Sequence, residues 1–490
     1  MITGDKFRER VARLKPNVYM GGRLVDRFDS KLIGGVNVMA ATYDFAFDSE
    51  FKEIGVATSH LTGEKVNRFT HIHQSVEDLL NKQKMTRVYS QEVGGCIQRC
   101  MGIDALNALS VVTYEADQKY GTKYNENFIN FLKRVQKEDL SLNCAQTDAK
   151  GNRRWRPHEQ KDPDLYLHVV EKRPDGIIVN GAKAHNTCSA YVDEIVAIPT
   201  RNLTAEEQDW AVAFAVPSDY EGVTLINAAF WPNPRRTLEA PFNKTGSSHS
   251  ITVFDHVFVP WERVFMCGET ELAGKLALLF ALYHRHSYTG CKAAVSEIFT
   301  GATALAAEYN GIARAQHVRH KLADMIQIID LIYAVGIASA VNAIKADSGT
   351  YIPDSNYCNA GRMLAGEIIY DEYEALAAIA GGLPATLPLE EDFYNEKTGP
   401  YLHKYIMRDP DIPAEHQHRA FRLFQDMMSS AWGGHKLIDY LHGGGSPVIE
   451  KVAIYRDHNI EHSKNIVKKL AGIPFEGSTK DIYRQSHAWL

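Results

Sequence analysis

Residues 165–179 read Leu-Tyr-Leu-His-Val-Val-Glu-Lys-Arg-Pro-Asp-Gly-Ile-Ile-Val and mark a change in the character of the chain. Residues 165–170 and 177–179 are mostly apolar and favour strands, whereas residues 172–176 have the composition of a tight turn. This combination predicts two antiparallel strands joined by a hairpin.

Further strand-like runs follow the hairpin, at residues 194–198, 211–216 and 251–254. Short strands separated by turns are typical of a small antiparallel barrel or sandwich. The pattern begins near residue 141 and ends near residue 270. We therefore expect a middle β domain over residues 141–270.

The sequence on either side of this region is helical in character. Apolar residues recur at helical spacing in residues 103–112 and 128–135, and Ser75 with Asp78 three residues later predicts a capped helix start. Long Ala/Leu/Ile stretches at residues 293–309 and 322–346 predict further helices, and Pro447 is placed to begin one of the last. The order is helical, β, helical, which predicts domains at 1–140, 141–270 and 271–490.

Composition excludes several classes of protein. The chain has 490 residues, a formal charge of −6, 45% hydrophobic and 23% charged residues, which is ordinary for a folded enzyme and argues against a nucleic-acid partner bound by bulk charge. We find no apolar run of 18 residues and no apolar segment of the kind that a secretory signal carries near the N-terminus. We therefore expect a cytoplasmic protein without a membrane partner.

Cysteine supplies the first candidate metal ligands. There are seven cysteines at irregular spacing, which makes a disulfide framework improbable. Cys96 and Cys100 are four apart, so on a helix they would share one face and could bind one metal ion or cluster. The alternative at this point is a pair of buried core cysteines, and this spacing is not a common one for iron–sulfur proteins.

A second stretch carries chemistry in residues 283–292. His284, Tyr288, Cys291 and Lys292 fall on one helical face, and such a polar stripe is costly in a core unless protein partners or a ligand satisfy it. His284 and Cys291 would lie about 10 Å apart along an ideal helix axis, too far for one ion. A larger inorganic cluster, or a kink at Gly290, would ease that geometry.

Taken together, these features resemble the 4-hydroxyphenylacetate 3-hydroxylase superfamily and, within it, the 4-hydroxybutyryl-CoA dehydratase (vinylacetyl-CoA isomerase) family. The resemblance covers nearly the whole chain and rests on the element order, Thr147-Asp148, Gly-Ala-Lys-Ala-His at 181–185 and Val-Phe-Asp-His-Val-Phe-Val-Pro at 253–260. It implies an α+β, acyl-CoA dehydrogenase-like fold, with an N-terminal helical domain, a middle antiparallel β-barrel domain and a C-terminal helical bundle.

The resemblance also implies two cofactors and their sites. A [4Fe–4S] cluster would be bound by Cys96, Cys100, His284 and Cys291, beside FAD. The implied catalytic residues are His284, Tyr288, Lys292, His249, Asp439, Gln98 and Arg87. The implied flavin contacts are Gln146, Thr147, Arg153 and Thr187, with Gly381 and Gly382 completing the site from a neighbouring subunit of a homotetramer.

Three positions depart from the family pattern. His249 and Asp439 stand where the family has glutamates, and Gln146 stands where it has a methionine near the flavin. A histidine can be neutral or cationic near pH 7, whereas a glutamate is normally an anion. We therefore expect a substrate range shifted from 4-hydroxybutyryl-CoA itself.

The activity implied is radical-type dehydration of a hydroxyacyl-CoA, with or without isomerisation of the vinylacetyl-CoA type. Two other readings remain open from the sequence. One is a flavin-dependent aromatic monooxygenase of the same superfamily with structural cysteines. The other is a non-catalytic or zinc-binding structural protein.

Overall fold

A computed structural model describes residues 1–230 and 246–479 of the chain. The N-terminal part is mainly helical, as expected, and Ser75 caps the first long helix by accepting a hydrogen bond from the Asp78 backbone N–H at 3.1 Å. Its elements are α1 (Gly4–Val11), β1 (Val18–Met20), β2 (Arg23–Leu24), α2 (Ile33–Asp44), α3 (Lys52–Gly55), β3 (Val56–Thr58), β4 (Lys65–Asn67), α4 (Val76–Val93), α5 (Cys100–Tyr120) and α6 (Tyr124–Glu138).

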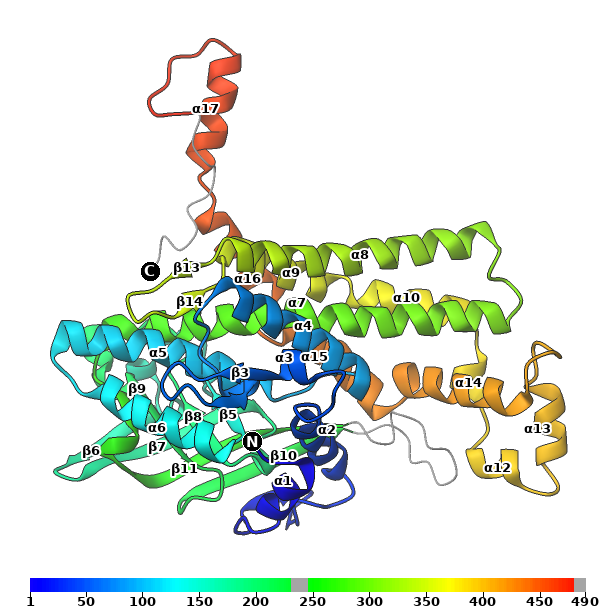
Figure 1. Ribbon diagram of the computed structural model, residues 1–490, viewed down its shortest axis with the longest axis horizontal. Coiled ribbons are helices and arrows are strands. Elements are labelled where there is room, and N and C mark those ends of the chain that lie inside the picture. The colour runs from blue at the N-terminus through cyan, green and yellow to red at the C-terminus, as the bar shows by residue number, and fades with distance from the viewer. Residues whose placement is uncertain (231–245, 480–490) are drawn as a thin grey trace.

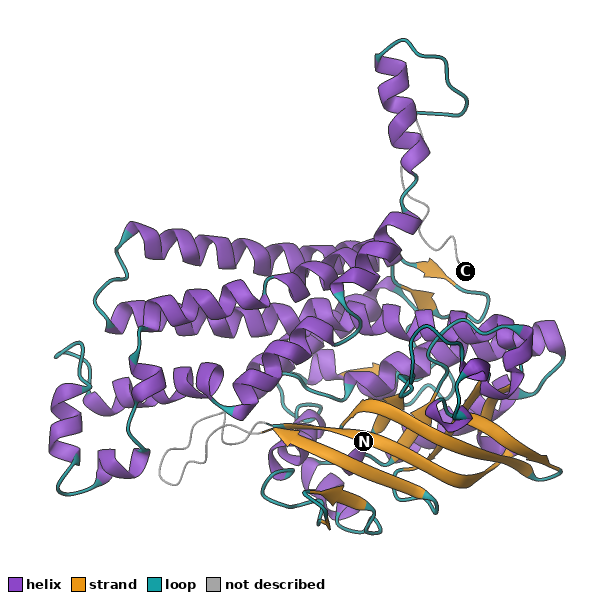
Figure 2. Ribbon diagram, turned by 180° about the vertical axis from the view of Figure 1, so that it is seen from behind, coloured by secondary structure: helices purple, strands orange, loops and turns teal. Residues whose placement is uncertain are grey.

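The middle part forms two sheets (Figure 2). Its strands are β5 (Leu142–Ala145), β6 (His168–Arg173), β7 (Gly176–Thr187), β8 (Glu194–Ala197), β9 (Val212–Pro217), β10 (Val223–Phe230), β11 (Ser247–Pro260) and β12 (Val264–Cys267). The six-stranded sheet has the order β2-β1-β10-β11-β7-β6, and the four-stranded sheet has the order β12-β9-β8-β5. The predicted hairpin is confirmed as β6 and β7, which pair antiparallel.

The expected closed barrel is not found among the described residues. The two sheets remain separate, and each contains one parallel pair, β1 with β10 and β5 with β8, so neither is purely antiparallel. Apolar side chains of both sheets share one core, in which Phe214 and Phe254 meet edge to face with ring centroids 5.6 Å apart. The sandwich alternative therefore describes this part better.

Helices resume at residue 270 and form an elongated bundle (Figure 1). The elements are α7 (Thr270–Tyr309), α8 (Gln316–Val341), β13 (Ile344–Lys345), β14 (Tyr351–Ile352), α9 (Ser355–Glu367), α10 (Ile369–Ala380), α11 (Leu383–Thr386), α12 (Glu390–Tyr394), α13 (Gly399–Tyr405), α14 (Ala414–Ser429), α15 (Ala431–His442), α16 (Pro447–Asp457) and α17 (Ile460–Leu470). Pro447 begins α16, as predicted. The central helix is α7, which packs against α4, α5, α8 and α9.

Two features of the bundle leave apolar surface exposed. Within the described ranges, α8 alone is long and apolar enough to cross a membrane, a weak signal that core helices also give. The second feature is α17, which projects away from the body, as Figure 1 shows, with Val467 and Leu470 exposed.

Candidate active site

The candidate ligands meet where the start of α5 packs against the middle of α7. The expectation that Cys96 and Cys100 share one helix is wrong, because α5 begins at Cys100 and Cys96 lies in the preceding loop. Gly94 adopts a left-handed conformation that ends α4. Gln98, in the loop between the two cysteines, also has a positive φ of 62°. The kink considered at Gly290 is also absent, because α7 is helical throughout Thr270–Tyr309.

Three thiols lie near one another at this junction, with Cys100 and Cys291 buried and Cys96 half-buried. Burial raises the pKa of Cys100 well above its ordinary value, and the neighbouring Cys96, Asp104 and Cys291 raise it further. Burial raises the pKa of Cys291 and of Cys96 in the same way, with Cys96 adding to the effect at Cys291. Thiols that repel one another as thiolates are unfavourable together unless a cation compensates their charge.

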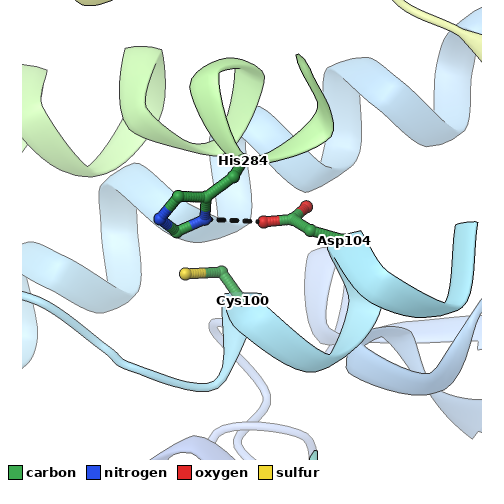
Figure 3. A group of neighbouring side chains, drawn as sticks. All are labelled: Cys100, Asp104 and His284. Atoms are coloured by element: carbon green, nitrogen blue, oxygen red, sulfur yellow. Dashed lines mark hydrogen bonds and ion pairs between the residues drawn. The ribbon is translucent and has the colours of Figure 1, made fainter. Parts of the chain in front are cut away.

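His284 is oriented by a buried carboxylate. Its Nδ1 lies 2.9 Å from Oδ2 of Asp104, which is itself paired with Lys82 at 2.7 Å and fully buried. Burial would raise the pKa of Asp104, but Lys82 and then His284 hold it below its usual value. Figure 3 shows the other ring nitrogen of His284 and the Cys100 sulfur pointing to the same side. With Nδ1 directed to Asp104, Nε2 is left to act as a ligand, an arrangement typical of metal-binding histidines.

This donor set suits an iron–sulfur cluster. It offers three cysteine sulfurs, of which Cys96 is half-buried and Cys100 and Cys291 are buried, and one histidine nitrogen, with the Cys100, Asp104 and His284 ligand atoms within 4.8 Å of one another. Soft thiolate ligands favour iron–sulfur clusters, Zn²⁺ or Cu⁺. A cluster is larger than one ion, so it would bridge ligands that lie too far apart for a single ion.

The other predicted catalytic residues have defined partners. Tyr288 donates from its hydroxyl to the Asp439 carbonyl oxygen at 3.2 Å, and this brings α7 to α15. Lys292 is buried in an ion pair with Glu372 of α10, and burial lowers its pKa. Lys292 lies one turn beyond Tyr288 on α7, and the Glu372 carboxylate compensates its charge.

Gln98 and Arg87 are also engaged. Gln98 is fully buried, accepts from the Tyr191 hydroxyl and donates to the Gly246 carbonyl at 2.9 Å. Arg87 forms an ion pair with Glu297 and stacks on Tyr333 at 4.3 Å. Gln98 thus belongs to the loop that contains Cys96, whereas the Arg87 side chain points toward α7 and α8.

His249 and Asp439 come together from distant parts of the chain. His249 of β11 contacts Thr187 Oγ1 through Nδ1 at 3.1 Å and His435 Nε2 through Nε2 at 3.2 Å. Asp439 of α15 forms an ion pair with Lys436 at 2.9 Å. Burial would raise the pKa of Asp439, but Lys436 holds it well below its usual value, so this carboxylate is ionised.

The predicted flavin contacts divide into two groups. Gln146, Thr147 and Thr187 lie at the ends of β5 and β7, where Gln146 donates to the Ala277 carbonyl at 2.9 Å. The buried Oδ1 of Asn143 beside Thr187 has no hydrogen-bond partner among the described residues, which suits a bound polar ligand. Arg153 is exposed on the loop that follows β5.

Gly381 and Gly382 form the second group. They follow α10, which packs on α7, α14 and α15 rather than on the sheets, and nothing lies within 4 Å of the position of a side chain at either glycine. Within one chain the two groups are therefore not brought together.

Sequence reasoning missed Asp104 and His435. Asp104 continues the spacing of Cys96 and Cys100 by another four residues, so a search for the carboxylate partner of a metal-binding histidine would have found it. His435 precedes Asp439 by four residues on one helix face, which is also a readable signal. Its contact with His249, 186 residues away, is not readable from spacing.

Comparisons with known proteins show what this chain is similar to. Models of the 4-hydroxyphenylacetate 3-hydroxylase N-terminal and C-terminal regions match residues 3–266 and 273–472. The 4-hydroxybutyryl-CoA dehydratase/vinylacetyl-CoA-Δ-isomerase of Clostridium aminobutyricum is 38% identical over 488 residues, covering 96% of this chain and 100% of that protein. The chain belongs to the 4-hydroxybutyryl-CoA dehydratase family.

Solved structures of related proteins share the fold of this chain. An oxygen-tolerant archaeal 4-hydroxybutyryl-CoA dehydratase from N. maritimus matches with a TM-score of 0.93 and 36% identity, covering 99% of this chain and 98% of that one. The oxygenase component of 4-hydroxyphenylacetate 3-monooxygenase complexed with FAD matches with a TM-score of 0.86 and 25% identity, covering 96% and 98%. Aromatic monooxygenases are thus more distant from this chain than the dehydratase family is.

Proposed function

We propose that this protein is an FAD- and [4Fe–4S]-dependent lyase that dehydrates a hydroxyacyl-CoA similar to 4-hydroxybutyryl-CoA. One observation carries the proposal. The Cys100 thiol, with Cys96 and Cys291 near it, lies beside a histidine whose Nδ1 is directed to a buried carboxylate, in a chain that is homologous over its full length to a dehydratase. An aromatic monooxygenase has no evident use for this ligand set.

When bound, the cluster supplies a Lewis-acidic iron for the leaving hydroxyl, and the flavin supplies one-electron chemistry. The residues of the chain position and protect these groups. Asp104 orients the His284 ring through Nδ1, so Nε2 is the atom that would hold the metal or could accept a proton. Tyr288 carries a phenolic proton beside the same site, where its donation to the Asp439 carbonyl holds the ring in place.

The flavin is expected on the β5 and β7 side of the site. Gln146, Thr147 and Thr187 supply polar contacts there. Burial lowers the pKa of Lys150, and Arg153 lowers it further, which indicates positive charges close together on the neighbouring loop. Such a concentration suits the pyrophosphate of FAD or of CoA.

A homotetramer is part of the proposal. Gly381 and Gly382 cannot contact the Thr187 region of their own chain through α10, so a neighbouring subunit would supply them. The projecting α17 exposes Val467 and Leu470, and exposed apolar patches of this kind mark protein interfaces.

We also propose that the protein works in the cytoplasm. The seven cysteines form no disulfide, which supports a reducing compartment.

The test is an anaerobic assay of 4-hydroxybutyryl-CoA beside a panel of substituted hydroxyacyl-CoA esters. We expect dehydration of at least one ester, with weak activity on 4-hydroxybutyryl-CoA that rises in His249→Glu. Full-rate turnover of 4-hydroxybutyryl-CoA by the wild type would show that His249 and Asp439 are neutral changes. No dehydration of any ester by the cluster-loaded enzyme would contradict the proposal.

A further inference from the structure

Two histidines and one aspartate converge beside the thiol group without a role in holding it. His249 comes from β11, while His435 and Asp439 come from one face of α15. The two Nε2 atoms are 3.2 Å apart, His435 Nε2 is 3.9 Å from Asp439 Oδ2, and the three ligand atoms all lie within 4.8 Å of one another. Two segments far apart in sequence therefore bring three potential ligands to one point.

These distances are close to those around a single metal ion. With bonds of about 2.0–2.2 Å to nitrogen and oxygen, neighbouring ligand atoms of one Zn²⁺ lie roughly 3.0–3.5 Å apart. The separation of the two imidazole nitrogens is in that range. The Asp439 oxygen lies 3.9 Å from His435 Nε2 and within 4.8 Å of the His249 ligand atom, so a side-chain movement of roughly 1–2 Å would bring it to the same shell.

Each candidate ligand is held by a further contact. His249 contacts Thr187 Oγ1 through Nδ1 at 3.1 Å, which leaves Nε2 for a ligand bond. The His435 ring stacks on Phe230 with the ring planes 4° apart, whereas Lys436 pairs with the Asp439 Oδ2 atom itself and would have to move aside for an ion. Support of this kind fixes ring orientation at metal centres, and such outer contacts change metal affinity by about 10–100-fold.

The protonation states also suit metal binding. Burial lowers the pKa of His435 to about 3, and Lys436 lowers it further. Burial likewise lowers the pKa of His249, although Asp439 opposes the effect. Both rings are therefore neutral near pH 7, as ligands must be, and the side chains of His435 and Asp439 are 12% and 20% exposed, so an ion can enter.

We propose that His249, His435 and Asp439 form a second metal site, for one divalent ion of the Zn²⁺ or Fe²⁺ type. Two imidazoles and one carboxylate are ligands that such ions accept, and three protein ligands leave a position open for water or a substrate oxygen. Lys436 already neutralises Asp439, so the bound ion would keep positive charge at this point and favour an oxygen ligand. The site is separate from the Cys96, Cys100, His284 and Cys291 set and does not depend on the proposed reaction.

Zinc is the probe, because it is counted separately from cluster iron. The anaerobically purified full chain is incubated with Zn²⁺, freed of loose metal by gel filtration and measured by mass spectrometry for zinc and iron. We expect about one zinc per chain in the wild type and in the control His416→Ala, whose side chain is exposed on α14. His249→Ala and His435→Ala should each lower zinc at least tenfold, with cluster iron unchanged.

Two further variants make the result decisive. Cys96→Ala should lose iron but keep zinc, which separates this site from the cluster, and His435→Asn should behave as His435→Ala while preserving side-chain shape. Retained iron shows that a histidine variant is folded. Wild-type zinc no higher than in His435→Ala would overturn the proposal, as would zinc that is lost from Cys96→Ala but kept in both histidine variants.

Discussion

Asp104 is the residue on which the orientation of His284 depends. Replacing it by asparagine removes the carboxylate that His284 Nδ1 contacts, so we expect iron content or turnover to fall about 10–100-fold. The matched control is Ser287→Ala, which removes a hydroxyl that also donates to Asp104 but leaves the His284 contact and the Lys82 ion pair. Iron content and turnover are measured for both variants. Full iron with full activity in Asp104→Asn would show that His284 needs no carboxylate partner.

Residue types were predictable at this scale, and their partners were not. The four ligand positions and Tyr288 could be found from short spacings. The helix expected for Cys96 failed because Gly94, in its left-handed conformation, ends α4 just before it. The partner of Lys292 is Glu372, 80 residues away, and no local pattern indicates a pairing at that distance.

At the scale of elements, α4 and α7 approach most closely at Gly290. A methyl group there would overlap Thr86 Oγ1 and the Gln83 carbonyl oxygen. We expect Gly290→Ala to destabilise the protein by about 1–3 kcal/mol in thermal or denaturant unfolding. Gly301→Ala is the matched control on the same helix, where nothing lies within 4 Å, and should be neutral or stabilising by about 0.5–1 kcal/mol. Equal effects of the two substitutions would refute the close approach.

The buried ion pair between Lys292 and Glu372 joins α7 to α10. Lys292→Met leaves a buried carboxylate without its cation, so we expect a loss of about 3–5 kcal/mol. The double variant Lys292→Met with Glu372→Gln should recover much of that stability. Measuring turnover in the stable double variant then separates structure from catalysis: activity near wild type would mean that Lys292 serves packing, and a large loss would support its predicted catalytic role.

At the scale of the whole molecule, the proposed tetramer has a direct physical measure. We expect light scattering to give four times the 54.9 kDa chain mass, and deletion of residues 460–490 to lower both assembly size and flavin content. The reason is the exposed apolar face of α17 together with the distance of Gly381 from the sheets. A flavin-loaded monomer in solution would be incompatible with a shared flavin site.

The helical, β, helical order of the fold was predictable because hydrophobic period changes from helical to strand-like along the chain. The membership of the sheets was not predictable, because β1 and β2 join the six-stranded sheet from the N-terminal part. Strand pairing across some 200 residues, as between Val18 and Leu225, leaves no local trace in sequence. The domain boundaries near residues 140 and 270 remain predictions.

The central claim is a four-iron cluster bound by Cys96, Cys100, His284 and Cys291. Its most direct test is the iron and acid-labile sulfide content of the anaerobically purified protein, measured for the wild type, Cys96→Ala and Cys291→Ala. We predict about four irons and four sulfides per chain in the wild type and a loss of most of both in each variant. Full iron content in both cysteine variants would contradict the account.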